Sequence, residues 1–170
     1  MPRTPTQGVA FLLGFVIALW LSPFLIGVAH GDAAESRWGD AEASLLEAVN
    51  AERERMHLIP LLRNRDLDAV ARAHSADMAR RNYLSHVNPE GLNPLERVQE
   101  AGIGGLTLVA ENAGLTDRND PTLEILQSWL TSPEHRRNLH APPFNRTGLG
   151  IVRAGNGTWY VTQLYATVPR

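Results

Sequence analysis

The clearest constraint on the fold is the strand pattern at the C-terminal end of the chain. Residues 148–153 and 158–167 are rich in β-branched and aromatic residues, and Ala154-Gly155-Asn156-Gly157 between them is a strong hairpin turn. Most of the chain between residues 40 and 140 shows helical periodicity instead. Helices followed by an antiparallel hairpin predict an α+β domain in which helices cover a sheet.

Apolar periodicity and capping residues predict a series of helices before the hairpin. They cover residues 40–56, 64–82, 94–101, 120–130 and a short segment that begins at Ser132-Pro133. Asp40 is expected to cap the first helix, and the second helix carries His74 on its apolar face. We therefore expect His74 to be a buried, hydrogen-bonded core residue. Residues 106–110 are expected to add a third strand.

The N-terminal end of the chain has the pattern of an export signal. The apolar segment 9–29 follows a weakly basic start and precedes small and polar residues, with candidate cleavage sites after Ala29 or near Ala33. An uncleaved anchor is the alternative, because the segment can span ~30 Å of hydrocarbon. We assign residues 1–34 to a signal peptide or membrane anchor with a short linker, and residues 41–168 to the domain. The expected location is secreted or envelope-associated, extracellular or periplasmic.

Composition excludes several classes of protein. The 170 residues include no cysteine, which rules out disulfides, thiolate metal sites and a cysteine nucleophile. An exported domain without cysteine fits a bacterial source. The net charge of -2 gives no broad basic surface, so we expect no nucleic acid partner. Any membrane contact is expected only through an uncleaved N-terminal segment, and the domain is expected to be a monomer.

Chemically useful side chains are concentrated between residues 85 and 135. His86 lies in Ser85-His86-x-x-Pro89-x-Gly91, a loop that proline and glycine force to turn, and pinning of this loop is its alternative role. Glu111 ends the expected strand, where a buried carboxylate needs a cation or several donors. Asn112 most simply caps or bridges the backbone.

His135 is expected in the first turn of the last short helix. The positive helix end there favours the neutral imidazole, which binds metal or accepts a proton. Glu134 is expected to complement the helix dipole, and Arg136-Arg137 to lie on a solvated face. Ser85 is not expected to be a nucleophile, because adjacent side chains seldom face each other. The sequence contains no Gly-x-Ser-x-Gly, His-Glu-x-x-His or Gly-Lys-Ser/Thr motif.

Taken together, these motifs resemble the CAP superfamily of cysteine-rich secretory, antigen 5 and pathogenesis-related proteins, and most closely its bacterial, cysteine-free SCP-like branch. The resemblance covers about residues 44–166. Its motifs are Leu46-x-x-x-Asn50-x-x-Arg53, Pro60-Leu61, Leu67-x-x-x-Ala71-x-x-His74-Ser75-x-x-Met78-Ala79, Ser85-His86-x-x-Pro89-x-Gly91, Pro94-x-x-Arg97, Glu111-Asn112, Trp129-x-x-Ser132-Pro133-x-His135-Arg136-x-Asn138 and Gly148-x-Gly150.

The resemblance implies a three-layer α-β-α sandwich with a central antiparallel sheet and an open cleft lined by His and Glu. His86 and Glu111 match the first His and first Glu of that cleft, and His135 matches a His of the bacterial branch. Tyr160 stands where the family commonly has a second cleft His. The resemblance therefore implies a ligand-binding cleft of His86, Glu111, Asn112, His135 and Tyr160.

Two functions follow from this resemblance. The first is a non-enzymatic exported domain that binds a lipid, glycan, peptide, divalent metal or cell-envelope component in the cleft. The second is a metal-assisted, peptidase-like hydrolase in which His86, Glu111 and His135 are the candidate catalytic residues. Zn²⁺ or another divalent metal is the candidate cofactor, with His86, His135 and Glu111 as its ligands.

Overall fold

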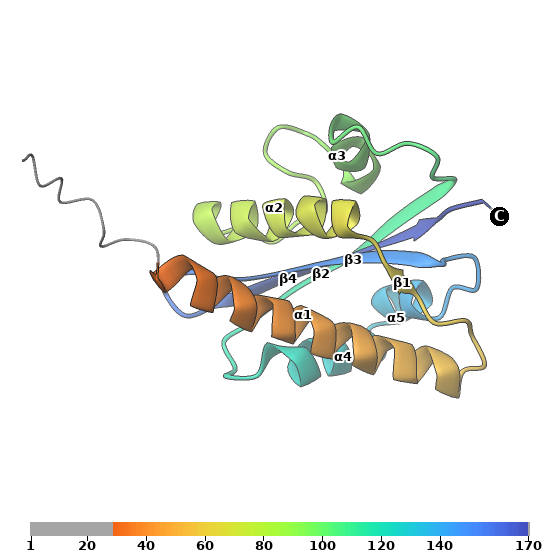
Figure 1. Ribbon diagram of the computed structural model, residues 1–170, viewed down its shortest axis with the longest axis horizontal. Helices are drawn as coiled ribbons and strands as arrows, with labels where there is room; N and C mark the ends of the chain where they lie inside the picture. Colours follow the sequence, from red (N-terminus) through yellow and green to blue (C-terminus); the bar gives the residue numbers. More distant parts are fainter. Residues whose placement is uncertain (1–28, 170) are drawn as a thin grey trace, which may run out of the picture.

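The computed structural model describes residues 29–169, with side chains from residue 39 onward, and Figure 1 shows its arrangement. This part of the chain forms five helices and four strands. They are α1 (Ala29–Arg55), β1 (Leu62–Arg63), α2 (Arg65–Arg81), α3 (Pro94–Glu100), β2 (Leu108–Thr116), α4 (Pro121–Thr131), α5 (Pro133–Leu139), β3 (Arg146–Arg153) and β4 (Trp159–Thr167). Most of the apolar segment assigned to the export signal or anchor lies outside the described residues.

The strands form one sheet with the order β1-β3-β4-β2. Strands β2, β4 and β3 are antiparallel, whereas the two-residue β1 runs parallel to β3. Helices α2 and α3 cover one face of the sheet, and α1, α4 and α5 cover the other (Figure 1). The predicted α+β fold with three layers and a central antiparallel sheet is therefore confirmed, with β1 as a short parallel addition.

Local capping chemistry confirms most of the predicted helix starts. Asn64 accepts hydrogen bonds from the first turn of α2, and Asp120 does the same for α4. Asn93 and Glu96 form a capping box at α3, where each side chain binds the backbone N–H of the other residue. Proline opens α3, α4 and α5, a position where its missing N–H costs nothing.

Three local predictions were wrong. Helix α1 begins at Ala29, so Asp40 lies inside the helix and does not cap it. Ser132 precedes α5 but makes no side-chain capping hydrogen bond. The third strand covers Leu108–Thr116 instead of residues 106–110, so Glu111 lies within the strand and not at its end. Pairing with β4 along its whole length extends β2 beyond what its own residues indicate.

Two glycines allow α2 to lie directly on β3. A Cβ atom at Gly148 would stand 2.2 Å from the carbonyl carbon of Leu67, and one at Gly150 would stand 2.3 Å from that of Ala71. Both neighbours are helix backbone, which cannot rotate away as a side chain can. The Gly-x-Gly pattern therefore fixes the distance between α2 and the sheet, and with it the position of the loop that follows α2.

Buried carboxylates cover the part of β3 that β1 does not pair with. The Asp68 carboxylate accepts from the Leu149 N–H at 2.8 Å, and Glu42 accepts from the Ile151 N–H at 3.4 Å. Arg63 bridges both carboxylates, at 2.5 Å to Glu42 and 2.7 Å to Asp68. These contacts satisfy backbone donors that an open strand edge would leave unpaired.

On the opposite face, buried Arg53 anchors the end of α5. Its guanidinium donates to the carbonyl oxygens of Leu139 at 2.8 Å, Ala141 at 3.1 Å and Phe144 at 3.2 Å. A cation is favourable beside the carbonyl end of a helix. The anchor fixes α5, which carries His135, against α1.

The Gly148→Ala variant should be strongly destabilised, because the added methyl group meets the backbone of α2. We expect a loss of about 2–4 kcal/mol in the free energy of unfolding, at the upper end of overpacking effects. Urea denaturation measures this loss. Gly155→Ala is the matched control, since a Cβ there meets nothing within 4 Å. Equal stabilities for the two variants would contradict the close contact.

Candidate functional site

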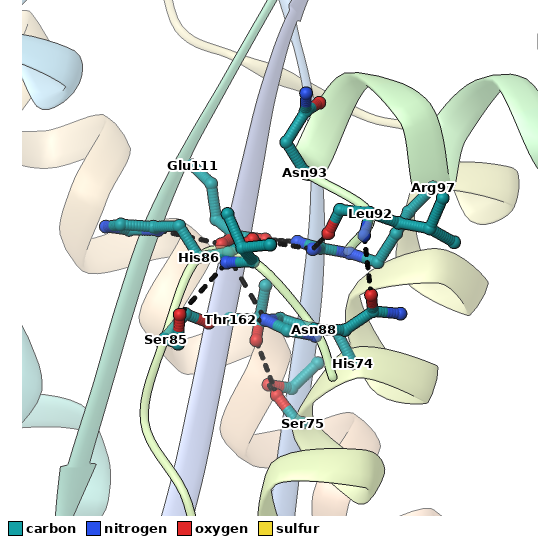
Figure 2. A network of polar contacts seen from close by, with 12 residues as sticks. His74, Ser75, Ser85, His86, Asn88, Leu92, Asn93, Arg97, Glu111 and Thr162 are labelled. Carbon is teal, nitrogen blue, oxygen red and sulfur yellow. Dashed lines mark hydrogen bonds and ion pairs between the residues drawn. The ribbon is translucent and has the colours of Figure 1, made fainter. Parts of the chain in front are cut away.

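Glu111 is the centre of the candidate site. It lies within edge strand β2, opposite Leu164 of β4, and its side chain is 1% exposed on the face that α2 and α3 cover. A carboxylate buried this deeply is costly unless charges or hydrogen-bond donors surround it. Figure 2 shows His74, His86 and Arg97 gathered around it.

His86 is the half-exposed member of this group. Its Nδ1 lies 2.8 Å from Oε1 of Glu111, and its side chain is 51% exposed. The contact assigns a proton to Nδ1, because an ionised carboxylate can only accept. Nε2 has no partner among the described residues and is the ring nitrogen available to a ligand. The hydrogen bond to Glu111 raises the pKa of His86, which favours the charged imidazolium.

Arg97 supplies the countercharge that a buried carboxylate requires. Its guanidinium contacts Oε2 of Glu111 through a short hydrogen bond. The other terminal nitrogen donates to the carbonyl oxygens of His86 at 2.7 Å and Leu92 at 3.0 Å. Arg97 therefore joins α3 to β2 and to the loop that carries His86.

His74 forms the inner wall of the site, and its predicted burial is confirmed at 2% exposure. Its Nε2 lies 2.9 Å from the carbonyl oxygen of Ser85 and 3.9 Å from Oε1 of Glu111. Burial lowers the pKa of His74, so the contact with Glu111 is one of a neutral imidazole and not an ion pair. His74 positions the loop through Ser85.

Asn112 makes its hydrogen bonds on the opposite face of β2. Adjacent strand residues point to opposite faces, so Asn112 faces α5 while Glu111 faces α2. Its side-chain amide donates to the carbonyl oxygen of His135 at 3.0 Å and accepts from Asn138 at 2.9 Å. The predicted backbone bridge is thus present, and it fixes the first turn of α5 against β2.

His135 is brought beside His86 by this arrangement. The ring centroids of the two histidines are 6.5 Å apart, and the Trp129 ring lies 6.4 Å from that of His135. Burial, followed by the charge of His86, lowers the pKa of His135. The neutral form expected from the sequence is therefore favoured, although burial rather than the helix end is its main cause. The buried Nδ1 of His135 has no hydrogen-bond partner in the described structure.

Tyr160 is placed away from these residues. It pairs with Leu115, four positions along β2 from Glu111, and packs with Met78 and Ala113. Its hydroxyl contacts Oδ1 of Asn82 at 3.2 Å. The structure thus brings His86, Glu111 and His135 together around the β2 edge, with Asn112 as a positioning residue, while Tyr160 supports the end of α2.

The donor set as arranged does not fit a divalent metal. Both oxygens of Glu111 are engaged, by His86 and by Arg97, and the guanidinium would repel a cation at the carboxylate. Within residues 29–169, no three His, Cys, Asp or Glu side chains are grouped so as to hold a metal ion. Zinc binding therefore stays a prediction, and no chemistry is derived from it.

From the sequence alone, Arg97 has no role beyond its place in a motif. The sequence indicates the need for such a cation only indirectly, because a glutamate in a mostly apolar strand requires one if it is buried. Nothing in the sequence shows which of the many arginines supplies that cation. Only the packing of α3 against β2 does so.

The chain matches the family described as "CAP: Cysteine-rich secretory protein family" over residues 46–165. It is 33% identical over 115 residues to the uncharacterized protein YkwD of Bacillus subtilis (strain 168), covering 68% of this chain and 44% of that protein. The uncharacterized membrane protein YlbC of the same bacterium is 27% identical over 113 residues, or 66% of this chain and 32% of the relative. The chain therefore spans less than half the length of these curated relatives.

Solved structures show the same fold. An extracellular protein containing a SCP domain from Bacillus anthracis str. Ames matches with a TM-score of 0.72 and 27% identity, covering 84% of this chain and 45% of that one. An outer surface protein from Borrelia burgdorferi matches with a TM-score of 0.69 and 16% identity, covering 76% and 94% of the two chains, and supports the fold alone. The chain belongs to the CAP family.

The titrations of His86 and His135 should be separated in pH. On lowering the pH, His86 gains its proton above the ordinary histidine pKa of about 6.5 and His135 below it. Imidazole nitrogen NMR resolves the two. Glu111→Gln should lower the pKa of His86. Glu134→Gln should change this pKa little, because the charge of Glu134 acts on His86 more weakly. A His86 pKa unaffected by Glu111→Gln would contradict the contact.

The same shifts predict how stability depends on pH. The folded-state pKa of His86 is raised, so its stabilising contribution is complete below the unfolded pKa and is lost as pH rises through the folded value. The lowered pKa of His135 has the opposite effect, since its contribution is lost as pH falls through the folded value.

The Arg97→Met variant should destabilise the domain by about 3–5 kcal/mol, because it leaves a buried carboxylate without its cation. Urea denaturation measures this loss. The double variant Arg97→Met, Glu111→Leu should recover part of the stability, since no uncompensated charge remains. If the double variant loses as much unfolding free energy as the two single variants together, the loss in Arg97→Met is not caused by breaking the ion pair.

Proposed function

We propose that this CAP domain is an exported, non-enzymatic binding domain that holds a small ligand between His86 and His135. The observation that supports this best is the state of Glu111. Its oxygens are engaged by His86 and Arg97 and its side chain is buried, so it is poorly placed to take a proton from water or substrate. Its role is instead to orient and charge His86.

The two histidines offer a ligand complementary contacts. His86 presents its Nε2–H, a charged donor for a phosphate, carboxylate or carbonyl oxygen. Neutral His135 carries a buried nitrogen without a partner, which a polar group of the ligand would satisfy. A site with a cationic donor and a neutral imidazole suits an anionic group with a neighbouring hydroxyl or ester.

Apolar side chains around His86 favour a lipid over the other ligand classes. Leu84 and Val87 flank His86 in its loop, and Leu95 lies in the first turn of α3. Each of these three side chains is close to half exposed. An acyl chain would cover them while the headgroup binds His86. We therefore propose an anionic lipid as the ligand.

Export to the cell surface or envelope is part of the same proposal. It is supported by the apolar segment at residues 9–29, most of which precedes the described structure, and by the likeness to an extracellular SCP-domain protein. In residues 29–169, none of the helices has the length and apolar character needed to cross a bilayer.

Calorimetric titration with dihexanoyl phosphatidate, a short-chain anionic phospholipid, tests the proposed site. We expect saturable binding at about pH 6 that weakens as the pH rises through the raised pKa of His86, because the charged donor is then lost. His86→Asn should abolish binding. His57→Asn is the matched control, since His57 is exposed and distant in sequence from the site, and its positive φ of 58° suits asparagine.

Two results would contradict this function. One is phospholipid binding that is equal in the His86→Asn and His57→Asn variants. The other is Zn²⁺-dependent hydrolysis of a peptide substrate that His86→Ala abolishes, which would establish the metal-assisted hydrolase instead. Zinc calorimetry on the wild type and on the His86→Ala, His135→Ala double variant separates this second result from adventitious metal binding.

A further inference from the structure

A large cleft lies between α2 and α3, beside the His86 site but not part of it. Its volume is about 1000 Å³, and its walls come from α2, from α3 and from the loops on both sides of α3, one of which also carries His86. Pockets that bind small molecules measure about 300–1,000 Å³, so this cleft has room for an extended ligand. His86, Glu111 and His135 do not line it. His74 and Arg97 do, and their other sides hold Glu111.

These two wall residues carry polar atoms that the protein leaves unsatisfied. His74 Nδ1 and Arg97 Nε are buried and have no hydrogen-bond partner in the described structure. Both residues are at least nine-tenths buried, so each unmade hydrogen bond carries a cost.

The chemistry of the two atoms is complementary. His74 donates from Nε2 to the Ser85 carbonyl and is neutral, so its Nδ1 is an acceptor that points away from that bond. The Nε–H of Arg97 is a donor. A hydroxyl group both donates and accepts, so hydroxyl groups of one ligand can satisfy both atoms.

The charge of the cleft selects against anions. Asp66 and Glu100 line it and form no ion pair among the described residues. Asp77 also lines it but is occupied by Arg80, Arg81 and the hydroxyl of Tyr83. The charge of Arg97 is compensated by Glu111 and His74 is neutral. Carboxylates therefore dominate the free charge of the cleft, which favours a cationic ligand.

Small and aliphatic side chains make up much of the remaining wall. Ala69 and Ala73 are exposed on α2, and Leu92 and Ile103 are further lining residues. Small and aliphatic side chains of this kind can pack against the C–H faces of sugar rings. The ligand must therefore combine hydroxyl groups, positive charge and flat C–H faces.

We propose that the cleft between α2 and α3 is a second binding site, which takes an oligosaccharide with free amino groups. Its hydroxyl groups bind His74 Nδ1 and Arg97 Nε, and its ammonium groups lie near Asp66 and Glu100. The site is separate from the one proposed for lipid, although the two share His74 and Arg97 as a common wall.

Titration of the full-length protein with the tetramer of glucosamine tests this site by NMR and calorimetry. We expect saturable shifts of the backbone amides of Ala69, Ala73 and Gly102. Ala73→Trp fills the cleft and should weaken binding by about tenfold or more. Ala51→Trp, at an exposed alanine of α1 outside the cleft, should leave affinity unchanged. Ala69→Trp is the second cleft-filling variant if Ala73→Trp does not fold.

Charge variants test the choice of ligand. The double variant Asp66→Asn, Glu100→Gln should reduce the preference for the glucosamine tetramer over its N-acetylated form. The control double variant Glu47→Gln, Glu54→Gln on α1 should leave this preference unchanged. His86→Asn should retain sugar binding, so this test stays valid even if no lipid binds at His86. Absence of binding, binding unaffected by both tryptophan variants, or shifts confined to Leu84, His86 and Val87 would overturn the proposal.

Discussion

The burial of the Glu111 carboxylate is the interaction on which the rest of the site depends. A carboxylate in this position requires a cation and further donors, and two separate elements meet to provide them. Arg97 comes from α3 and His86 from the loop after α2, while His74 of α2 holds that loop through Ser85. The ion pair therefore stabilises the packing of α3 on β2, and in the same contact it sets the orientation and the charge of the half-exposed His86.

Strand alternation then extends this control to the other face of the sheet. Glu111 and its neighbour Asn112 point to opposite sides of the edge strand. Asn112 holds the first turn of α5, while Arg53 holds its end, so His135 comes to lie beside His86. Two histidines from different layers thus meet around an edge strand, with the pKa of one raised and that of the other lowered.

The sequence predicted those features that local chemistry determines. The helix starts at Asn64, Pro94 and Asp120 are such features, because a side-chain oxygen within two or three residues, or a proline, sets each start. It did not predict β1, whose two residues form a strand only through their pairing with β3. Nor did it place Glu111 within a strand, because the length of β2 is set by a partner about fifty residues later in the chain. The resemblance identified His86, Glu111 and His135, but not how they are held. The role of Arg97 depends on packing between distant segments, which no local pattern records.

Neutron diffraction from crystals of the protein at about pH 6.5, the ordinary histidine pKa, locates individual protons and so tests whether Glu111 holds His86 as a charged donor. The account predicts deuterium on both ring nitrogens of His86, with the Nδ1 deuteron directed at an undeuterated Glu111 carboxylate, and a single deuterium on the ring of His135. A deuterium on Glu111, or a His86 ring with a bare Nδ1, would contradict it, since the carboxylate would then not hold His86 as a charged donor.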